Sequence, residues 1–259
     1  MSGSLPQQVG AIAWRSVTQT MRLPAIVVPP ILFPLILLAV NVGGLDAATK
    51  IPGFPADSYL DFAIAVAFMQ GGLFAMVNAG SALARDVETG FIRRLAMTPM
   101  QRSALLIGQL GGVMATALLC TAIYLGVGFA VGLNVEAGVG GLVVVVALAM
   151  LVALAFASLG ALVGLRSGSG EAVQGFFPLF FVALFLSSMS LPRDLIEQDW
   201  FRAIATVNPV SYLVEGLRSP IITGWDGQAL ALGFGFALAI AVLGILGASS
   251  ALKTRLVRT

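Results

Sequence analysis

The chain has 259 residues, of which 58% are hydrophobic and only 10% are charged, and its formal net charge at pH 7 is +2. Soluble proteins carry about a quarter charged residues, so this chain has too few polar side chains to cover a surface in water. Its apolar runs are continuous rather than alternating and extend over about 20 residues, which favours membrane-spanning helices over the strands of an outer-membrane barrel. We therefore predict an all-α integral membrane protein.

The composition also excludes several kinds of site. The chain has no histidine, so Ser-His-Asp hydrolysis and histidine-ligated metals are ruled out. Its single cysteine, Cys120, lies in an apolar run and is interpreted as a packing residue. Neither of its two lysines, Lys50 and Lys253, follows the glycine-rich pattern with which a P-loop holds phosphates. We expect no catalytic residue, no metal, no nucleotide site and no nucleic-acid partner for this chain.

The first predicted element, residues 1–24, is an amphipathic helix in the membrane interface. Apolar residues recur at helical spacing between Leu5 and Arg22, polar residues take the other side, and Trp14 suits the boundary between lipid and water. Six transmembrane helices are predicted within residues 25–252, at about 25–42, 59–84, 104–133, 139–165, 172–191 and 229–252. We expect an interruption of the third at Gly111-Gly112, and residues 253–259 form a basic tail. A cleaved signal peptide is the alternative to the first span, although an apolar stretch of about 18 residues is long for that role.

Between the last two spans, the stretch over about 200–217 is too polar and too short to cross a membrane. It is interrupted at Asn208-Pro209 and contains Glu215, so we predict an outer re-entrant helical segment.

The distribution of basic residues predicts the orientation of the chain. With the N-terminus in the cytoplasm, 10 of the 14 lysines and arginines lie on the inner side, and nine of the 12 acidic residues lie on the outer side. We therefore expect both termini in the cytoplasm. The small number of lysines and the abundance of Ala, Gly and Val favour a bacterial cell (inner) membrane.

The charged island after the second span, about residues 86–101, is predicted to form a cytoplasmic helix. Its acidic start suits the positive end of a helix dipole and a proline lies near its end, although composition alone also fits an ordinary basic loop. An acidic pair, then Thr-Gly-Phe-Ile-Arg-Arg-Leu, then Thr-Pro-Met-Gln-Arg-Ser resembles the cytoplasmic loop of type-2 ABC exporter permeases, in particular the daunorubicin/doxorubicin-resistance branch. The resemblance implies a coupling helix that docks on a separate ATP-binding subunit. Its expected coupling residues are Asp86, Glu88, Gly90, Phe91, Arg93, Arg94, Leu95 and Pro99.

The re-entrant stretch carries a second resemblance to the same permeases. Their outer segment has an Asn-Pro-x-x-Tyr element followed by an arginine six residues after the tyrosine, and this chain has the same pattern. The residues that we assign to this segment are Asn208, Pro209, Tyr212, Glu215 and Arg218. One departure is that Ser187-Ser188-Met189-Ser190 stands where many relatives have Ser-Gly.

The resemblance implies a half-transporter that is not an enzyme by itself. Two such chains, identical or related, would pair in the membrane lipid above two copies of an ABC ATP-binding subunit, which holds the ATP and Mg. Because the spans are apolar and lack buried charge, we expect export of a hydrophobic or amphipathic substrate such as a drug, lipid or glycolipid. The candidate substrate path comprises Gln70, Asn78, Phe177 and Phe181. The two amides could instead form hydrogen bonds between helices, and glycine pairs such as Gly160/Gly164 permit close contacts within one chain or between two.

Other functions fit the sequence less well. A polysaccharide-exporting permease of the same architecture stays open as an alternative. An ATP-independent secondary transporter usually places ionisable residues within its spans, and here they are nearly free of them. An intramembrane enzyme would need a nucleophile with a base or a metal cluster. A membrane scaffold demands no particular residues, and binding of an ATPase subunit would distinguish a permease from it.

Overall fold

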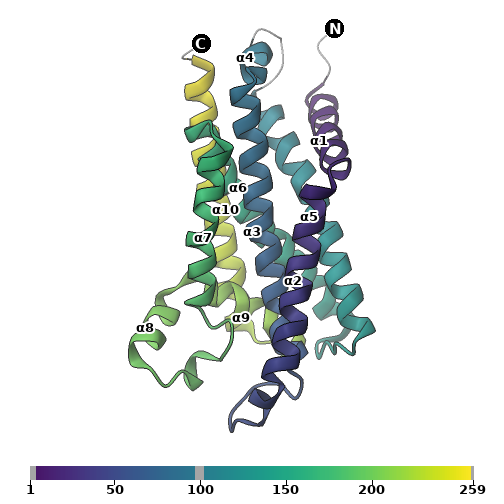
Figure 1. Ribbon diagram of the computed structural model, residues 1–259, viewed down its shortest axis with the longest axis vertical. Coiled ribbons are helices and arrows are strands. Elements are labelled where there is room, and N and C mark those ends of the chain that lie inside the picture. Colours follow the sequence, from purple (N-terminus) through teal and green to yellow (C-terminus); the bar gives the residue numbers. More distant parts are fainter. Residues whose placement is uncertain (1–3, 97–101, 258–259) are drawn as a thin grey trace.

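The computed structural model describes residues 4–96 and 102–257, and every regular element within these ranges is helical. The α-helices are α1 (Leu5–Met21), α2 (Pro24–Leu45), α3 (Tyr59–Glu88), α4 (Phe91–Ala96), α5 (Arg102–Ala130), α6 (Gly138–Ser167), α7 (Gly170–Phe185), α8 (Asp199–Val207), α9 (Pro209–Ile222) and α10 (Gly227–Val257). Two 3-10 helices, η1 (Asp46–Lys50) and η2 (Arg193–Leu195), lie in loops. The long helices run side by side in one bundle, and the two ends of the chain lie at the same end of it (Figure 1). The predicted all-α membrane fold is confirmed.

In the described part of the chain, five helices are long and apolar enough to cross a membrane, namely α2, α3, α5, α6 and α10. The helix α7 is also apolar but has 16 residues, about 24 Å at the α-helical rise. The prediction over 172–191 is therefore too long at its C-terminal end. The helix stops at Phe185, and the backbone N–H of Ser188 then donates to the hydroxyl of Ser211 in α9 at 3.1 Å.

Two other helices differ in extent from the predicted spans. The helix α3 continues to Glu88, beyond the predicted end of the second span. The helix α5 is not interrupted at Gly111-Gly112, and it ends at Ala130 because Gly132 turns the chain with a φ of 101°.

The helix α3 is the centre of the bundle and contacts α2, α5, α6, α7 and α9. Buried residues make up 78% of its most apolar window, against 17% for α2. The central position of α3 means that most of its side chains face other helices, whereas most of α2 faces outward.

Glycines allow the closest helix contacts. A Cβ added to Gly160 of α6 would lie 1.9 Å from the carbonyl oxygen of Met76 in α3, and one added to Gly164 would lie 2.2 Å from that of Gly80. Since real side chains cannot approach so closely, these positions require glycine. The predicted small-residue contacts of this pair are thus formed within one chain.

The helix α1 packs its apolar side along α5. Ile12 and Ser16 are buried against Gly108 and Gly112 of α5, which explains why the paired glycines do not break that helix. Trp14 on the other side of α1 is 73% exposed. The amphipathic helix predicted over residues 1–24 is present, and its place in the membrane interface stays a prediction.

The predicted re-entrant segment is the pair α8 and α9, bent at Asn208. Both helices lie at the end of the bundle opposite the termini (Figure 1). The last turn of α9 accepts hydrogen bonds from the turn before α6, from the N–H of Glu136 to Ile221 and from that of Ala137 to Pro220, at 3.1 and 3.0 Å. The segment therefore begins and ends at one end of the bundle and does not cross it.

Candidate functional site

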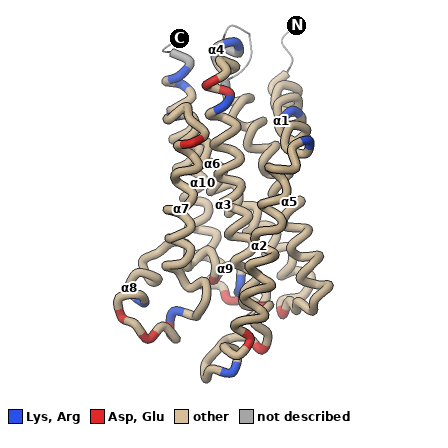
Figure 2. Tube along the Cα trace, viewed as in Figure 1, with Lys and Arg blue, Asp and Glu red and all other residues tan. Residues whose placement is uncertain are grey.

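Charged residues gather at the two ends of the bundle, and the helices between them are almost free of charge (Figure 2). The end that carries α4 and both chain ends is the one that the positive-inside rule predicts to face the cytoplasm. We refer to it as the basic end, and to the opposite end, with α8 and α9, as the outer end.

The predicted coupling helix over 86–101 is wrong in its first turn. Asp86 and Glu88 belong to the last turn of α3, and a separate short helix, α4, follows after Gly90. Gly90 has a φ of 67°, a left-handed conformation that side chains disfavour, and a Cβ there would meet nothing within 4 Å. Glycine is needed here for the backbone turn rather than for close approach.

Two of the predicted coupling residues meet α1 through Arg15. The guanidinium of Arg15 donates to Oδ1 of Asp86 at 2.8 Å, and Asp86 is 5% exposed. The same guanidinium lies over the ring of Phe91, 4.1 Å from its centroid. Arg15 thus joins α1, α3 and α4. No role for Arg15 was predicted from the sequence, although a buried carboxylate is unfavourable without a cationic or hydrogen-bonding partner.

The remaining coupling residues contribute less to the described structure. Arg94 is exposed, and its guanidinium donates to the carbonyl oxygen of Thr89 at 3.5 Å. Pro99 and the side chains of Arg93 and Leu95 lie outside the described part of the chain.

At the outer end, the Asn-Pro-x-x-Tyr motif fastens the start of α9. The side-chain oxygen of Asn208 accepts from the N–H of Val210 at 3.0 Å and caps the helix, while Pro209 occupies the first helical position. The amide nitrogen of Asn208 donates to the carbonyls of Ala183 and Leu186 at the end of α7, at 2.6 and 3.0 Å. The motif therefore ties α9 to the C-terminal end of α7.

Tyr212 of the motif and Glu215, three residues further along α9, contact the neighbouring elements. The hydroxyl of Tyr212 donates to the carbonyl oxygen of Thr206 in α8 at 2.7 Å, and its ring stacks on Phe236 of α10 with centroids 4.9 Å apart. Glu215 accepts from Arg193 of η2 at 2.6 Å, and the Arg193 guanidinium lies over the Tyr212 ring. These contacts connect η2, α8, α9 and α10.

Arg218 is the most enclosed charge at the outer end. It is 5% exposed, and its guanidinium donates to the carbonyl oxygens of Phe62 in α3 at 2.8 Å, of Ser188 at 2.5 Å, and of Met189. It also lies over the ring of Phe62, 3.4 Å from the centroid. One arginine therefore satisfies three carbonyls from α3 and from the turn after α7, a structural role that the motif alone did not indicate.

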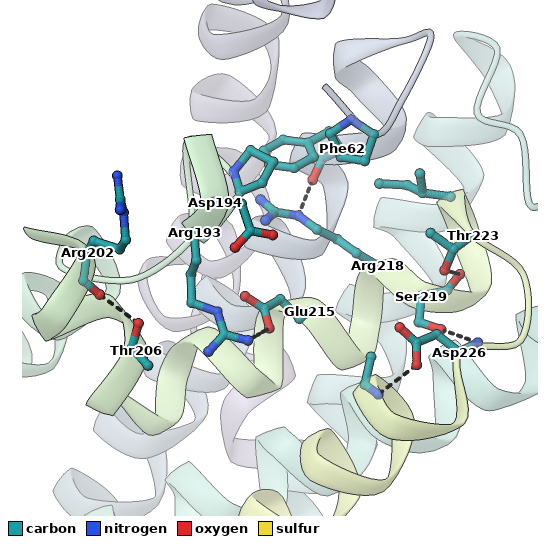
Figure 3. Close-up of a pocket in the computed structure, with 14 residues that line it drawn as sticks. Phe62, Arg193, Asp194, Arg202, Thr206, Glu215, Arg218, Ser219, Thr223 and Asp226 are labelled. Carbon is teal, nitrogen blue, oxygen red and sulfur yellow. Dashed lines mark hydrogen bonds and ion pairs between the residues drawn. The ribbon is translucent and has the colours of Figure 1, made fainter. Parts of the chain in front are cut away.

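A cavity of about 550 Å³ opens beside these residues (Figure 3). Its lining carries three arginines and three carboxylates: Arg193, Arg202, Arg218, Asp194, Glu215 and Asp226. Figure 3 shows Arg193 turned toward Glu215 and Arg218 toward the carbonyl of Phe62. Because the charges balance and most are occupied by protein partners, the cavity suits a neutral or zwitterionic polar group better than an ion.

The predicted substrate-path residues are only partly brought together. Phe177 and Phe181 of α7 stack with centroids 5.6 Å apart, and they extend to Phe74 of α3 at 5.6 Å and to Phe33 of α2 at 6.0 Å. We call this group the aromatic cluster, which consists of Phe33, Phe74, Phe177, Phe181 and Phe185.

The two amides have different surroundings. Asn78 is half-buried and lines a cavity of about 270 Å³ near the basic end, together with Phe74. Gln70 is 3% exposed and faces other helices, and its side-chain oxygen has no hydrogen-bond partner among the described residues. Asn78 therefore lines the same cavity as Phe74 of the aromatic cluster, and Gln70 does not line it.

The fold and these sites define the class of the protein: a multi-pass helical membrane protein with cavities at both ends and, within the described residues, no group of His, Cys, Asp and Glu that could hold a metal ion. The sequence profile of the ABC-2 type transporters matches residues 7–222. The chain therefore belongs to the ABC-2 type transporter family, and it is a membrane permease, the transport subunit of an ABC transporter. Permeases of this family do not bind nucleotide themselves and typically pair with an ATP-binding subunit.

Two relatives are both named "Putative transport permease ycf38". The protein from Pyropia yezoensis is 28% identical over 227 residues, which cover 84% of this chain and 75% of the relative. The protein from Porphyra purpurea is 24% identical over 263 residues, which cover 96% and 90%. The names agree with the family and specify no substrate.

Proposed function

We propose that the chain is the permease of an ATP-driven exporter of the drug-resistance type, which moves a hydrophobic or amphipathic substrate out of the cytoplasm or the inner leaflet. A separate subunit hydrolyses the ATP, and a second permease chain, identical or related, completes the pathway. The family match carries the ATP-dependent part of this proposal. The aromatic cluster supports the substrate class, because stacked phenylalanines between α2, α3 and α7 offer apolar contact and no charge.

The short helix α4 is the proposed docking element. Phe91 is half-buried and packs against the hydrophobic cluster that contains Ile92, and the Arg15 guanidinium covers its ring, so the ring is held in place while part of it stays accessible. A partly exposed aromatic side chain on a rigid support is a typical anchor at a protein interface. Movement of α4 would reach α1 and α3 through Arg15, because its guanidinium contacts both Asp86 and the Phe91 ring.

Two variants test docking and transmission separately. Phe91→Ala removes the anchor. We expect this variant to insert normally and to bind its ATP-binding subunit about 30-fold more weakly if the ring contributes about 2 kcal/mol. Arg15→Gln keeps the anchor and breaks the link to α1, so it should retain ATPase binding and lose substrate-stimulated ATP hydrolysis.

Binding is measured by co-purification of the tagged ATPase. ATP hydrolysis and efflux of a fluorescent amphiphile are measured in proteoliposomes. Arg94→Ala is the matched control on α4, since an exposed charge at the rim of an interface contributes little binding energy. Wild-type ATPase binding and transport by Phe91→Ala would refute the docking assignment. An intact permease that never binds the ATPase would refute the ATP-driven function.

A further inference from the structure

The cavity of about 270 Å³ near the basic end lies between α1, α2, α3 and α5, with one residue of α7 at its edge. Its polar lining residues are Ser16, Gln19, Thr20, Asn78, Ser81, Arg85, Gln109 and Gln174. Its apolar lining includes Leu23, Pro29, Pro30, Phe74 and Val113. Several of these, among them Gln19, Leu23 and Pro29, are exposed on the outside of the bundle, so the cavity opens sideways near the junction of α1 and α2.

A single charge lines this cavity. Arg85 is the only ionisable residue in the lining, it is exposed, and its guanidinium has no hydrogen bond or ion pair with any described residue. The adjacent carboxylate, Asp86, is already bonded to Arg15. The edge of the cavity therefore carries a positive charge that makes no direct ion pair with a described carboxylate, and Asp86 acts on it only through space.

The deeper wall offers hydrogen bonds without charge. Gln109 is 6% exposed, and the hydroxyl oxygen of Ser81 is buried with no hydrogen-bond partner among the described residues. A buried hydroxyl without a partner is unfavourable, so a ligand oxygen that reached it would be held there. Asn78 lies one helical turn further along α3 on the same wall.

The order of these groups follows the orientation of a lipid in the inner leaflet. At the helical rise, Asn78 lies about 10 Å and Phe74 about 16 Å along α3 from Arg85. The cation is thus at the membrane surface, the hydroxyl and amides come next, and Phe74 and Pro30 lead toward the middle of the bundle. A separate void of about 10 Å³ beside Pro30 and Phe74 reaches Thr116 and Cys120 of α5. A ligand with a headgroup at Arg85 and an apolar tail beside Phe74 would match each level.

We propose that this cavity binds an amphiphile with an anionic headgroup, a phosphate or a carboxylate, that enters sideways from the inner leaflet. Arg85 pairs with the headgroup, Ser81 and Asn78 bond its ester or hydroxyl oxygens, and the tail lies against Phe74 and Pro30. The ligand is either the transported substrate or a resident membrane lipid, since both present the same chemistry. Only the identification as a substrate rests on the proposed function, because binding does not require the ATPase.

The test measures lipid binding to the purified permease in a neutral detergent by native mass spectrometry. We expect dioleoyl phosphatidylglycerol to bind about tenfold more tightly than dioleoyl phosphatidylcholine, as one charge-assisted contact near a surface would give. Arg85→Gln should remove this preference and Arg85→Lys should retain most of it. Arg166 is an exposed arginine at the same end that does not line the cavity, so Arg166→Gln should leave the preference unchanged. Ser81→Leu, which fills the cavity, should weaken binding of both lipids.

Equal binding of the two lipids, or a preference that Arg85→Gln leaves intact, would overturn the proposal. Proteoliposomes with the ATPase bound distinguish a transported substrate from a resident lipid. ATP-dependent movement of fluorescent phosphatidylglycerol between the leaflets identifies a substrate. Tight binding without movement identifies a resident lipid. Both results support the site. ATPase association is measured in the same preparations, so its loss with lipid binding intact refutes the proposed function alone.

Discussion

Arg218 holds the outer end of the bundle together, and its removal should destabilise the whole protein. Arg218→Met replaces the arginine with an unbranched apolar side chain. The carbonyls of Phe62, Ser188 and Met189 then lose their hydrogen-bond donor. Each buried acceptor that loses its partner costs about 1–3 kcal/mol, and the variant no longer has to bury a guanidinium, which offsets part of the loss. We expect a net destabilisation of about 3–5 kcal/mol.

This loss is measurable by thermal unfolding of the purified protein in detergent, followed by the fluorescence of its three tryptophans. At about 2–4 °C per kcal/mol for a protein of this size, Tm should fall by about 6–20 °C. Arg218→Lys should fall between the wild type and Arg218→Met, because an ammonium cannot reach three carbonyls in one plane. Arg166→Gln, an exposed arginine, should change Tm by less than about 2 °C. A fall in Tm of less than about 2 °C for Arg218→Met would refute the reasoning.

Two further predictions concern helix packing and topology. Gly160→Val should prevent stable insertion or lower Tm by more than Arg218→Met does, because the valine side chain would overlap the carbonyl of Met76. Gly175→Ala is the control and should be tolerated, because the space around Gly175 is open. Expression and size-exclusion profiles of the two variants test this prediction. In a Cys120→Ala background, Ser167→Cys should react with a membrane-impermeant thiol reagent only from the cytoplasmic side and Asp199→Cys only from outside, and labelling of position 199 from inside would contradict the predicted orientation.

The sequence was sufficient for the class of fold because hydropathy is a local property. An apolar run of sufficient length must form a helix in lipid, whatever it packs against, since its backbone groups have no other partners there. The predicted spans follow from this rule, and a helix is found at each of them. The predicted interruption at Asn208-Pro209 separates α8 from α9. The boundaries that were wrong, at Glu88, Ala130 and Phe185, lie where a turn or a neighbouring helix decides the end.

The partners of the key side chains could not be read from the sequence, because they depend on which helices become neighbours. Asp86 was assigned to docking from its place in a motif, yet it is buried against Arg15, 71 residues away. Arg218 was recognised as part of a motif, but its acceptor in Phe62 lies 156 residues away. Arg85 had no assigned role until packing placed it alone beside Asn78 and Ser81. The sequence alone determined that these polar residues lie near the ends of apolar helices. Only the tertiary structure decided which of them pair with another part of the protein and which line a cavity.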